Sequence, residues 1–262
     1  MDILKRSFAP ITKNTWDEID SAAREAIIPM LSARRVLDVK GPKGFKYSGV
    51  QDGRLEIISQ KNDKVQAGIR KVVPLVELRI PLELLKWTLD DVERGAKDVN
   101  FDPLEEAARN IALAEEEIIY NGNKSAKITG LVQSAGHKLK IGSDANEILK
   151  SIGQAIYKLY ESSADAPYDL IVSKEIYEKL NIIYQGASLI KVISKLIGGN
   201  IIRSKVLKGA LLIPHKNEDF EFVLGSDFAV GYEGDCGESV RIFITESFTF
   251  RVLNADKIVY FS

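Results

Sequence analysis

Thiol chemistry is almost absent from this sequence. Cys236 is the single cysteine in 262 residues, so no intrachain disulfide can form. Small secreted proteins often depend on several disulfides, whereas a chain with one thiol suits a reducing compartment. The composition therefore excludes a disulfide scaffold and favours the cytoplasm.

Long apolar runs and an excess of one charge are also missing. No uncharged apolar run approaches the roughly 18 residues that span a bilayer. Lys5 and Arg6 resemble the basic start of a signal peptide, but no apolar region of about 7–15 residues follows them. The 36 basic and 37 acidic residues leave a net charge of -1, which argues against a general nucleic-acid binder. We expect a cytoplasmic protein that binds neither membrane nor nucleic acid.

The motifs of common enzyme classes are missing as well. The two histidines, His137 and His215, lie in no metal-binding motif, and glycine-rich phosphate loops and the GxSxG turn are absent. Cys236 lies among carboxylates, without the positive surroundings that activate a thiol, so we interpret it as an unreactive loop residue. The sequence predicts no catalytic residues and no metal site.

Three consecutive glutamates, Glu115 to Glu117, are the densest acidic run. Three carboxylates could suggest a metal site, but on a helix neighbouring residues fan over different faces. We therefore predict a solvated helix face.

Helices are predicted near the N-terminus and in the first half of the chain. Thr15 and Glu18 form a capping-box pattern, which predicts a helix from Thr15 to about Ile28 that Pro29 interrupts. The stretch 102–121 is the clearest helix, with Asp102 as its N-cap and Gly122 as its stop.

The remaining segments mix strands and helices. Residues 45–85 read as an extended hairpin that cannot bury a core alone, so we expect it to pack on a neighbour. Residues 136–213 alternate helices with strands, and the tail is all strand. Apolar residues at even positions from Val240 to Val252 predict a half-buried strand. The fold class is therefore α+β.

Two aromatic positions keep alternative interpretations. Trp87 is either a core or interface residue or an exposed platform for a planar ligand. Tyr184, in YQGAS, belongs either to a plain connecting loop or to the lining of an opening on a symmetry axis.

Several long motifs, in order, resemble the encapsulin shell proteins, the family once called linocin-type bacteriocins. The resemblance covers the whole chain. It is carried by LKRSFAPIT, RRVLDVKGP, RKVVPLVELR, LDDVERG, EEAARNIALAEEEIIYNG, LGSDFAVGYE and RIFITESFTFRVLN.

The resemblance implies the Hong Kong 97-type fold of tailed-phage major capsid proteins. In that fold a P-domain, an A-domain and an extended E-loop build an icosahedral shell. The corresponding segments here would be 1–48 for the N-terminal helix and the start of the P-domain, 49–78 for the E-loop, 79–135 for the P-domain with its long helix, 136–214 for the A-domain, and 215–262 for the C-terminal strands of the P-domain.

The same resemblance implies a shell protein that is not itself an enzyme. Copies of the chain, expected to be 60 in the smallest icosahedral (T=1) class, would enclose a cargo enzyme. Family cargo includes ferritin-like iron-storage or iron-oxidation proteins and dye-decolourising peroxidases, held by a short C-terminal peptide. We thus expect a nanocompartment linked to iron storage or oxidative stress.

The matching positions define the expected sites. Ile27, Arg34, Asp38 and Val230 would bind the cargo peptide, although Arg34 and Asp38 could instead bridge one another. The loop Tyr184, Gln185, Gly186, Ala187 and Ser188 would line a five-fold pore. Trp87 would contact a flavin in those members that bind one; no cofactor is required by the shell.

Two other functions stay open at this point. A prophage major capsid protein would share the fold, and neighbouring genes distinguish it from a compartment shell. A peptidase or bacteriocin, as older family labels suggest, is disfavoured because the sequence shows no catalytic constellation.

Overall fold

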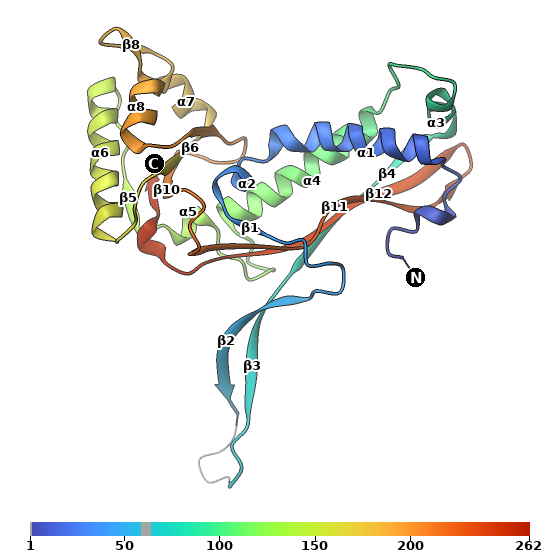
Figure 1. The fold of residues 1–262 in the computed structure, drawn as a ribbon, viewed down its shortest axis with the longest axis horizontal. Coiled ribbons are helices and arrows are strands. Elements are labelled where there is room, and N and C mark those ends of the chain that lie inside the picture. Colours follow the sequence, from blue (N-terminus) through green and yellow to red (C-terminus); the bar gives the residue numbers. More distant parts are fainter. Residues whose placement is uncertain (1, 59–63) are drawn as a thin grey trace.

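The computed structural model describes residues 2–58 and 64–262, and it combines helices with strands (Figure 1). Residues 59–63, in the predicted E-loop, lie outside the described part. The helices are η1 (Arg6–Phe8), α1 (Lys13–Ile27), η2 (Ile28–Met30), α2 (Ala33–Val36), α3 (Lys86–Glu93), α4 (Asp102–Asn121), α5 (Leu131–Ser134), α6 (Ala145–Glu161), α7 (Lys174–Leu180), α8 (Leu189–Ile197) and η3 (Ala255–Lys257).

The strands form two larger sheets and two hairpins. They are β1 (Val39–Lys40), β2 (Gly49–Ile57), β3 (Gly68–Pro74), β4 (Val76–Leu85), β5 (His137–Leu139), β6 (Tyr168–Val172), β7 (Ile183–Tyr184), β8 (Ala187–Ser188), β9 (Ile201–Arg203), β10 (Ala210–Pro214), β11 (Phe220–Cys236), β12 (Ser239–Val252) and β13 (Val259–Phe261).

A four-stranded sheet in the order β1-β11-β12-β4 forms the elongated half of the molecule (Figure 1). The long strands β11 and β12 are antiparallel, and β4 continues the sheet antiparallel to β12. α4 lies along β4 and β12, and α1 packs against α4 and reaches β11. Apolar side chains of both helices and of the sheet, including Ile19, Ile111 and Ile242, are buried together in one cluster.

Strand β12 departs from the half-buried pattern predicted for it. Its even positions from Val240 to Phe250 are buried, as expected, but Phe243, Thr245 and Thr249 on the other face are buried too. Phe243 lies over Gly231 of β11, where even a Cβ atom would come within 2.3 Å of its ring, and the Arg79 guanidinium stacks on it at 4.0 Å. The alternation predicted a solvated face because it could not show which side chains cover it.

A mixed five-stranded sheet in the order β5-β13-β10-β6-β9 forms the other half. Every residue of β6 and β10 is buried, because α6 and α8 cover one face and a second apolar cluster covers the other. The strand β13 comes from the predicted C-terminal P-domain segment, 215–262, yet it pairs between β5 and β10. The domain limits given by the resemblance remain a prediction.

One apolar cluster is shared by the two sheets. It contains Leu211 and Ile213 from β10, Phe222 from β11 and Phe248 from β12, together with Tyr120 at the end of α4. Phe222 and Phe248 meet edge to face at 5.7 Å. The two sheets are therefore joined through a common core.

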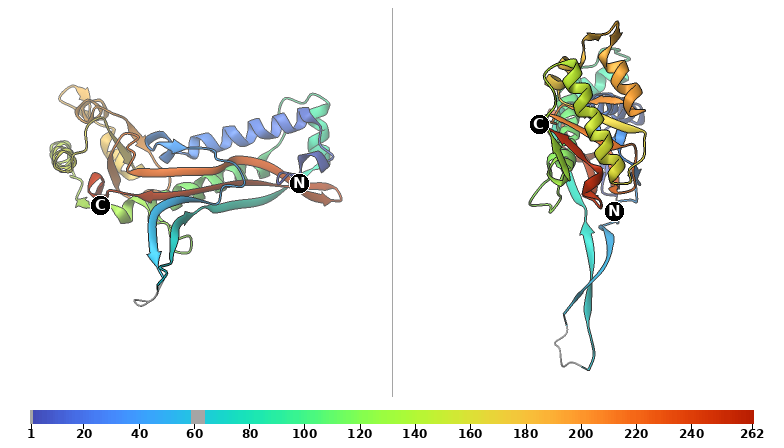
Figure 2. Two further views of the ribbon diagram at one scale, coloured as in Figure 1. Left: turned by 60° about the horizontal axis from the view of Figure 1, so that its bottom comes forward. Right: turned by 90° about the vertical axis from the view of Figure 1, so that its left-hand side faces the viewer.

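The hairpin of β2 and β3 projects away from both sheets (Figures 1 and 2). Its strands are antiparallel, and their side chains are mostly exposed. The prediction of an extended hairpin that buries no core of its own is confirmed for β2 and β3. It is wrong for the end of the predicted 45–85 segment, because β4 pairs with β12 and its Leu82 and Leu84 belong to the core.

The N-cap of the first helix lies three residues earlier than predicted. Thr12, not Thr15, is the N-cap of α1, and its hydroxyl accepts from the Thr15 amide at 3.2 Å. Pro29 interrupts the helix as predicted: α1 ends at Ile27, and Pro29 lies in the 3₁₀ turn η2. In α4, Asp102 is the first helical residue and Phe101 is the N-cap, whereas Gly122 ends the helix as predicted.

Candidate functional site

A groove of about 590 Å³ lies between α1 and β11. Three of the four residues predicted to bind a cargo peptide line it, namely Ile27, Arg34 and Val230. The fourth, Asp38, is not among the lining residues. The structure thus brings Val230 together with Ile27 and Arg34, about 200 positions earlier in the sequence.

The N-terminal arm forms part of the groove wall through Leu4 and Arg6. The Leu4 carbonyl accepts from the Tyr232 amide at 2.7 Å. Arg6 donates to the Val230 carbonyl at 2.7 Å and binds the two carboxylate oxygens of Asp20 at 2.8 and 2.6 Å. These contacts attach the arm to both walls, α1 and β11.

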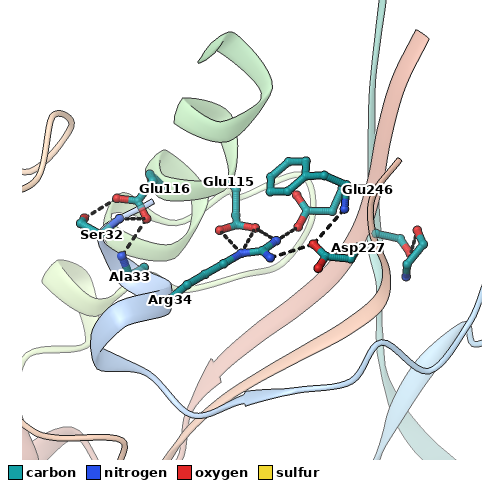
Figure 3. A network of polar contacts seen from close by, with 10 residues as sticks. Ser32, Ala33, Arg34, Glu115, Glu116, Asp227 and Glu246 are labelled. Atoms are coloured by element: carbon teal, nitrogen blue, oxygen red, sulfur yellow. Dashed lines mark hydrogen bonds and ion pairs between the residues drawn. The ribbon is translucent and has the colours of Figure 1, made fainter. Parts of the chain in front are cut away.

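Arg34 lies at the edge of the groove inside a network of carboxylates (Figure 3). Its Nε is 3.0 Å from both oxygens of Glu115 on α4, and its guanidinium binds Asp227 on β11 at 2.7 Å and Glu246 on β12. The guanidinium also stacks on Phe228 at 4.7 Å. One side chain therefore connects α2 with α4 and with both long strands.

Charge in this network is set by burial. The side chains of Glu115 and Glu246 are fully buried. Burial, reinforced by the nearby Glu115, raises the pKa of Glu246 well above its usual range, which Arg34 only partly opposes. Burial disfavours the charged form of Arg34, but its hydrogen bond to Glu115 and the charges of Glu115, Glu246 and Asp227 together outweigh this and raise its pKa above the ordinary value. Arg34 is thus a permanent cation, and Glu246 tends to hold a proton.

Glu116, the next residue on α4, fixes the start of α2. Its carboxylate accepts from the amides of Ser32 at 2.9 Å and Ala33 at 2.8 Å, and from the Ser32 hydroxyl (Figure 3). That hydroxyl also contacts the Tyr120 hydroxyl at 2.8 Å. Burial raises the pKa of Glu116 to about 7. Since α2 carries Arg34, Glu116 positions the groove edge indirectly.

The prediction of a solvated Glu115–Glu117 face is therefore wrong for two of the three residues. Glu115 and Glu116 are fully buried, and only Glu117 is exposed. Their partners, Ser32, Arg34 and Glu246, are about 80 to 130 positions away, and local spacing carries no signal for such contacts.

The interpretation in which Arg34 and Asp38 bridge one another does not match the observed contacts. Arg34 binds Glu115, Asp227 and Glu246, and no hydrogen bond or ion pair joins it to Asp38 in residues 2–58 and 64–262. The proposal that these two residues bridge one another is thus wrong. Whether they contact a peptide is a separate question.

Trp87 lies on α3, and 73% of its side chain is exposed. The interpretation as a core residue is therefore wrong, and the interface and ligand-platform interpretations remain. The Arg94 guanidinium lies 5.8 Å from its ring. Trp87 lines neither the groove nor a second cavity, of about 830 Å³, that lies between α1 and the segment joining α3 to α4.

The segment 184–188 is a small hairpin rather than an irregular loop. Tyr184 of β7 pairs with Ala187 of β8. The turn residues Gln185 and Gly186 have φ values of 49° and 81°, as a two-residue hairpin turn with both central residues left-handed requires. The Tyr184 hydroxyl donates to Asn146 at 2.6 Å. The hairpin lies at the outer end of the five-stranded half (Figure 1).

Other chemistry is sparse in the described ranges. No group of three His, Cys, Asp or Glu side chains is placed to hold a metal ion there. Cys236 is exposed at the turn between β11 and β12. None of the helices in that part of the chain is both long and apolar enough to cross a membrane.

Known proteins with similar sequences are shell proteins. Residues 1–249 match the family described as "Encapsulating protein for peroxidase". The type 1 encapsulin shell protein of Mycobacterium tuberculosis is 33% identical over 264 residues, covering 100% of both chains. That of Rhodospirillum rubrum is 34% identical, covering 99% of this chain and 96% of its own. That of Mycolicibacterium paratuberculosis is 33% identical, covering 99% and 98%.

Solved structures with the same fold are capsids and capsid-like particles. The virus-like particle from Pyrococcus furiosus aligns with a TM-score of 0.70 at 20% identity, covering 94% of this chain and 99% of its own. The capsid of Myoviridae phage XM1 aligns with a TM-score of 0.60 at 11% identity, covering 88% and 91%. The predicted Hong Kong 97-type fold is confirmed. By its full-length match, the chain belongs to the family of encapsulating proteins, together with the type 1 encapsulin shell proteins.

Proposed function

We propose that copies of this chain assemble into a closed icosahedral shell in the cytoplasm that encloses a cargo enzyme, and that the chain itself catalyses no reaction. Similarity to shell proteins over the full chain, on a capsid-type fold, is the observation that carries this proposal. The relatives are named for a structural role, and the groove has an ionic network but no nucleophile beside a base.

The β2–β3 hairpin supports assembly independently of the similarity. Six apolar residues on it or beside it are more than half exposed: Leu55, Ile57, Ile58, Val65, Ile69 and Val72. An isolated two-stranded hairpin is marginally stable in water, and exposed apolar surface of this kind marks an interaction site. A neighbouring copy would bury these side chains.

The chain length, without large insertions, favours the smallest icosahedral class, with about 60 subunits. Sixty chains of 29.1 kDa give a particle of about 1.7 MDa. Native mass spectrometry and negative-stain microscopy test this. A monomer or dimer under native conditions would reject the shell function, and a larger uniform particle would reject only the subunit number.

The groove is the proposed docking site for a C-terminal peptide of the cargo. Ile27 and Val230 would bury its aliphatic side chains, and the Arg34 edge and Asp38 would contact its polar groups. Ile27→Asp and Asp38→Ala should reduce the amount of cargo per particle while leaving assembly unchanged. Normal loading in both variants would reject the groove.

The proposed cargo is a peroxidase, which the family description names, or a ferritin-like protein, which the resemblance to the encapsulin shell proteins implies. Mass spectrometry of particles purified from the source organism identifies the enclosed protein.

By the resemblance, residues 184–188 would line the five-fold pore and Trp87 would contact a flavin. The flavin contact would be rejected if wild-type particles contained no flavin, or if Trp87→Ala particles retained all of theirs.

A prophage capsid is the second candidate, because the fold is shared with phage capsids. The similarity to those capsids is in fold alone, whereas the encapsulin shell proteins are similar in sequence over the full chain. A neighbouring gene for an enzyme with a Gly/Leu/Ile-rich C-terminal tail favours the shell, and neighbouring terminase and scaffolding genes favour the phage.

A further inference from the structure

The groove contains one cation that the chain does not neutralise. Arg6 is bound to Asp20, and Arg34 is bound to Asp227 as well as to the buried glutamates. Arg24 also lines the groove, and its side chain makes no hydrogen bond or ion pair with any residue in the described ranges, 2–58 and 64–262. Among the three arginines that line the groove, Arg24 is thus the one without a carboxylate partner in the described residues.

The position of Arg24 explains why it lacks a partner. Asp20 lies four residues earlier on α1, a spacing at which an acidic and a basic side chain normally pair. In this structure both oxygens of Asp20 are taken by Arg6 of the N-terminal arm, at 2.8 and 2.6 Å. Arg24 is left exposed, without a carboxylate partner among residues 2–58 and 64–262.

Apolar residues continue from Arg24 along the same side of the helix. Ile27, Ile28 and Leu31 follow it by three, four and seven residues, and all three line the groove. Ile28 is 60% exposed although it is aliphatic. On the opposite wall, Val230 and Ile244 are buried. The groove therefore presents an apolar strip that ends at an unpaired guanidinium.

We propose that Arg24 binds a carboxylate side chain of the docked peptide, so that the groove selects an aliphatic segment with an Asp or Glu beside its aliphatic residues. This rests on the proposed function of the groove. An arginine binds a carboxylate through two parallel hydrogen bonds. Arg34 cannot serve in this way, because three carboxylates of its own chain already occupy its guanidinium.

Peptide binding to empty shells tests the selection. The probes are fluorescein-labelled nonapeptides of Gly, Leu and Ile in which one Glu occupies each inner position in turn, each with a twin that has Gln there. Because the pair is partly exposed, we expect the best Glu peptide to bind about three- to ten-fold more tightly than its twin. In Arg24→Gln shells the two peptides of a pair should bind equally.

Arg35→Gln is the matched control, since Arg35 is exposed, has no ion pair in the described part and lies outside the groove.

Three results would overturn the inference. Equal binding of the Glu and Gln peptides to wild-type shells would show that the groove does not select an acidic side chain. A loss of affinity on amidating the peptide C-terminus, with no effect of Gln, assigns Arg24 to the terminal carboxylate instead. An equal loss in the Arg35→Gln control shows a general charge effect.

The Ile27→Asp variant separates this inference from the proposed function of the groove. If it abolishes binding while the Glu and Gln peptides bind equally, the role of Arg24 is rejected and the groove remains the docking site. If no peptide binds and Ile27→Asp does not change cargo loading, the groove is rejected as the docking site.

Discussion

The Arg34 network shows how one side chain stabilises several elements. A buried ion pair is not by itself strongly stabilising, because desolvation offsets attraction. Removing one partner is different, since it leaves the others buried without a counter-charge. Arg34 stands against two fully buried glutamates and Asp227, so its loss affects α4, β11 and β12 together.

Arg34→Ala should therefore lower the free energy of unfolding by about 3–5 kcal/mol, as for other broken buried pairs. Arg24→Ala is the control, because it changes an arginine of the same groove that has no ion pair, and it should cost under about 1 kcal/mol. Urea unfolding at one fixed chain concentration measures both. A loss below 1 kcal/mol for Arg34→Ala would mean that the carboxylates relax or take up protons freely.

Glu116 makes stability depend on pH. Its pKa is about 7 in the folded chain, against an ordinary value of 4.5, because it is buried. The folded state therefore binds a proton that the unfolded state has released, and stability falls as the pH rises from about 4.5 to about 7. This shift of pKa corresponds to about 3 kcal/mol at most.

Glu116→Gln removes that dependence while keeping an oxygen for the Ser32 and Ala33 amides. Relative to wild type, the variant should gain stability with rising pH, up to about 3 kcal/mol, and the gain should level off above pH 7. Unfolding free energies measured from pH 5 to 8 give this difference. Glu117→Gln, at the exposed neighbour, should show no trend, and an identical trend in both variants would contradict the assignment.

Residues such as Glu115 and Glu116 mark the limit of what this sequence predicts. Helical geometry correctly placed the three glutamates on different faces, but it could not show that two of those faces are covered by α2 and β12. Ile27 and Val230, by contrast, were placed in the groove by resemblance to a family. A partner of opposite charge that lies far away in the sequence leaves no local pattern. The apolar groove residues, by contrast, lie within sequence motifs that the family shares.

At the scale of elements, local sequence rules predicted the presence of helices more accurately than the residue at which each helix begins. Gly122 ends α4 as predicted, and Ser173, a residue type favoured at N-caps, caps α7 with its hydroxyl accepting from the Ile176 amide. The start of α1 was misplaced because Thr12 and Thr15 both fit a cap, and the choice depends on tertiary contacts. Glu93 of α3 accepts from both threonine hydroxyls, at 2.5 and 2.7 Å.

The β2–β3 hairpin is the element whose apolar residues lack a partner within the chain. Ile69→Asp places a charge on a side chain that is 57% exposed in one chain but buried in the proposed assembly. We expect it to abolish particle formation and to leave the circular dichroism spectrum of the subunit unchanged, because the hairpin contributes little to the core. Sedimentation velocity measures the particle fraction. Lys71→Ser on the same strand is the control, and intact particles in Ile69→Asp would show that this strand face is not an interface.

At the scale of the whole molecule, the two sheets do not behave as separate bodies. Their shared cluster joins β10 to β11, β12 and α4, and β13 returns from the chain terminus to pair between β5 and β10. A boundary drawn along the sequence at 214 therefore cuts through one sheet. Sequence patterns located the alternating segment but could not show that its sheet is completed by residues 259–261.

The fragment 136–214 should consequently fail to fold alone. Without β13 it loses Val259 and Phe261 from its core and leaves β10 unpaired along one edge, and its inner face, with Leu211 and Ile213, loses the cover of the shared cluster. We expect helical far-ultraviolet dichroism with poorly dispersed amide resonances and no cooperative unfolding, because exposed apolar surface replaces fixed packing. The intact chain under the same conditions is the reference. A fragment with dispersed resonances and a sharp transition would show instead that the alternating segment is an independent domain.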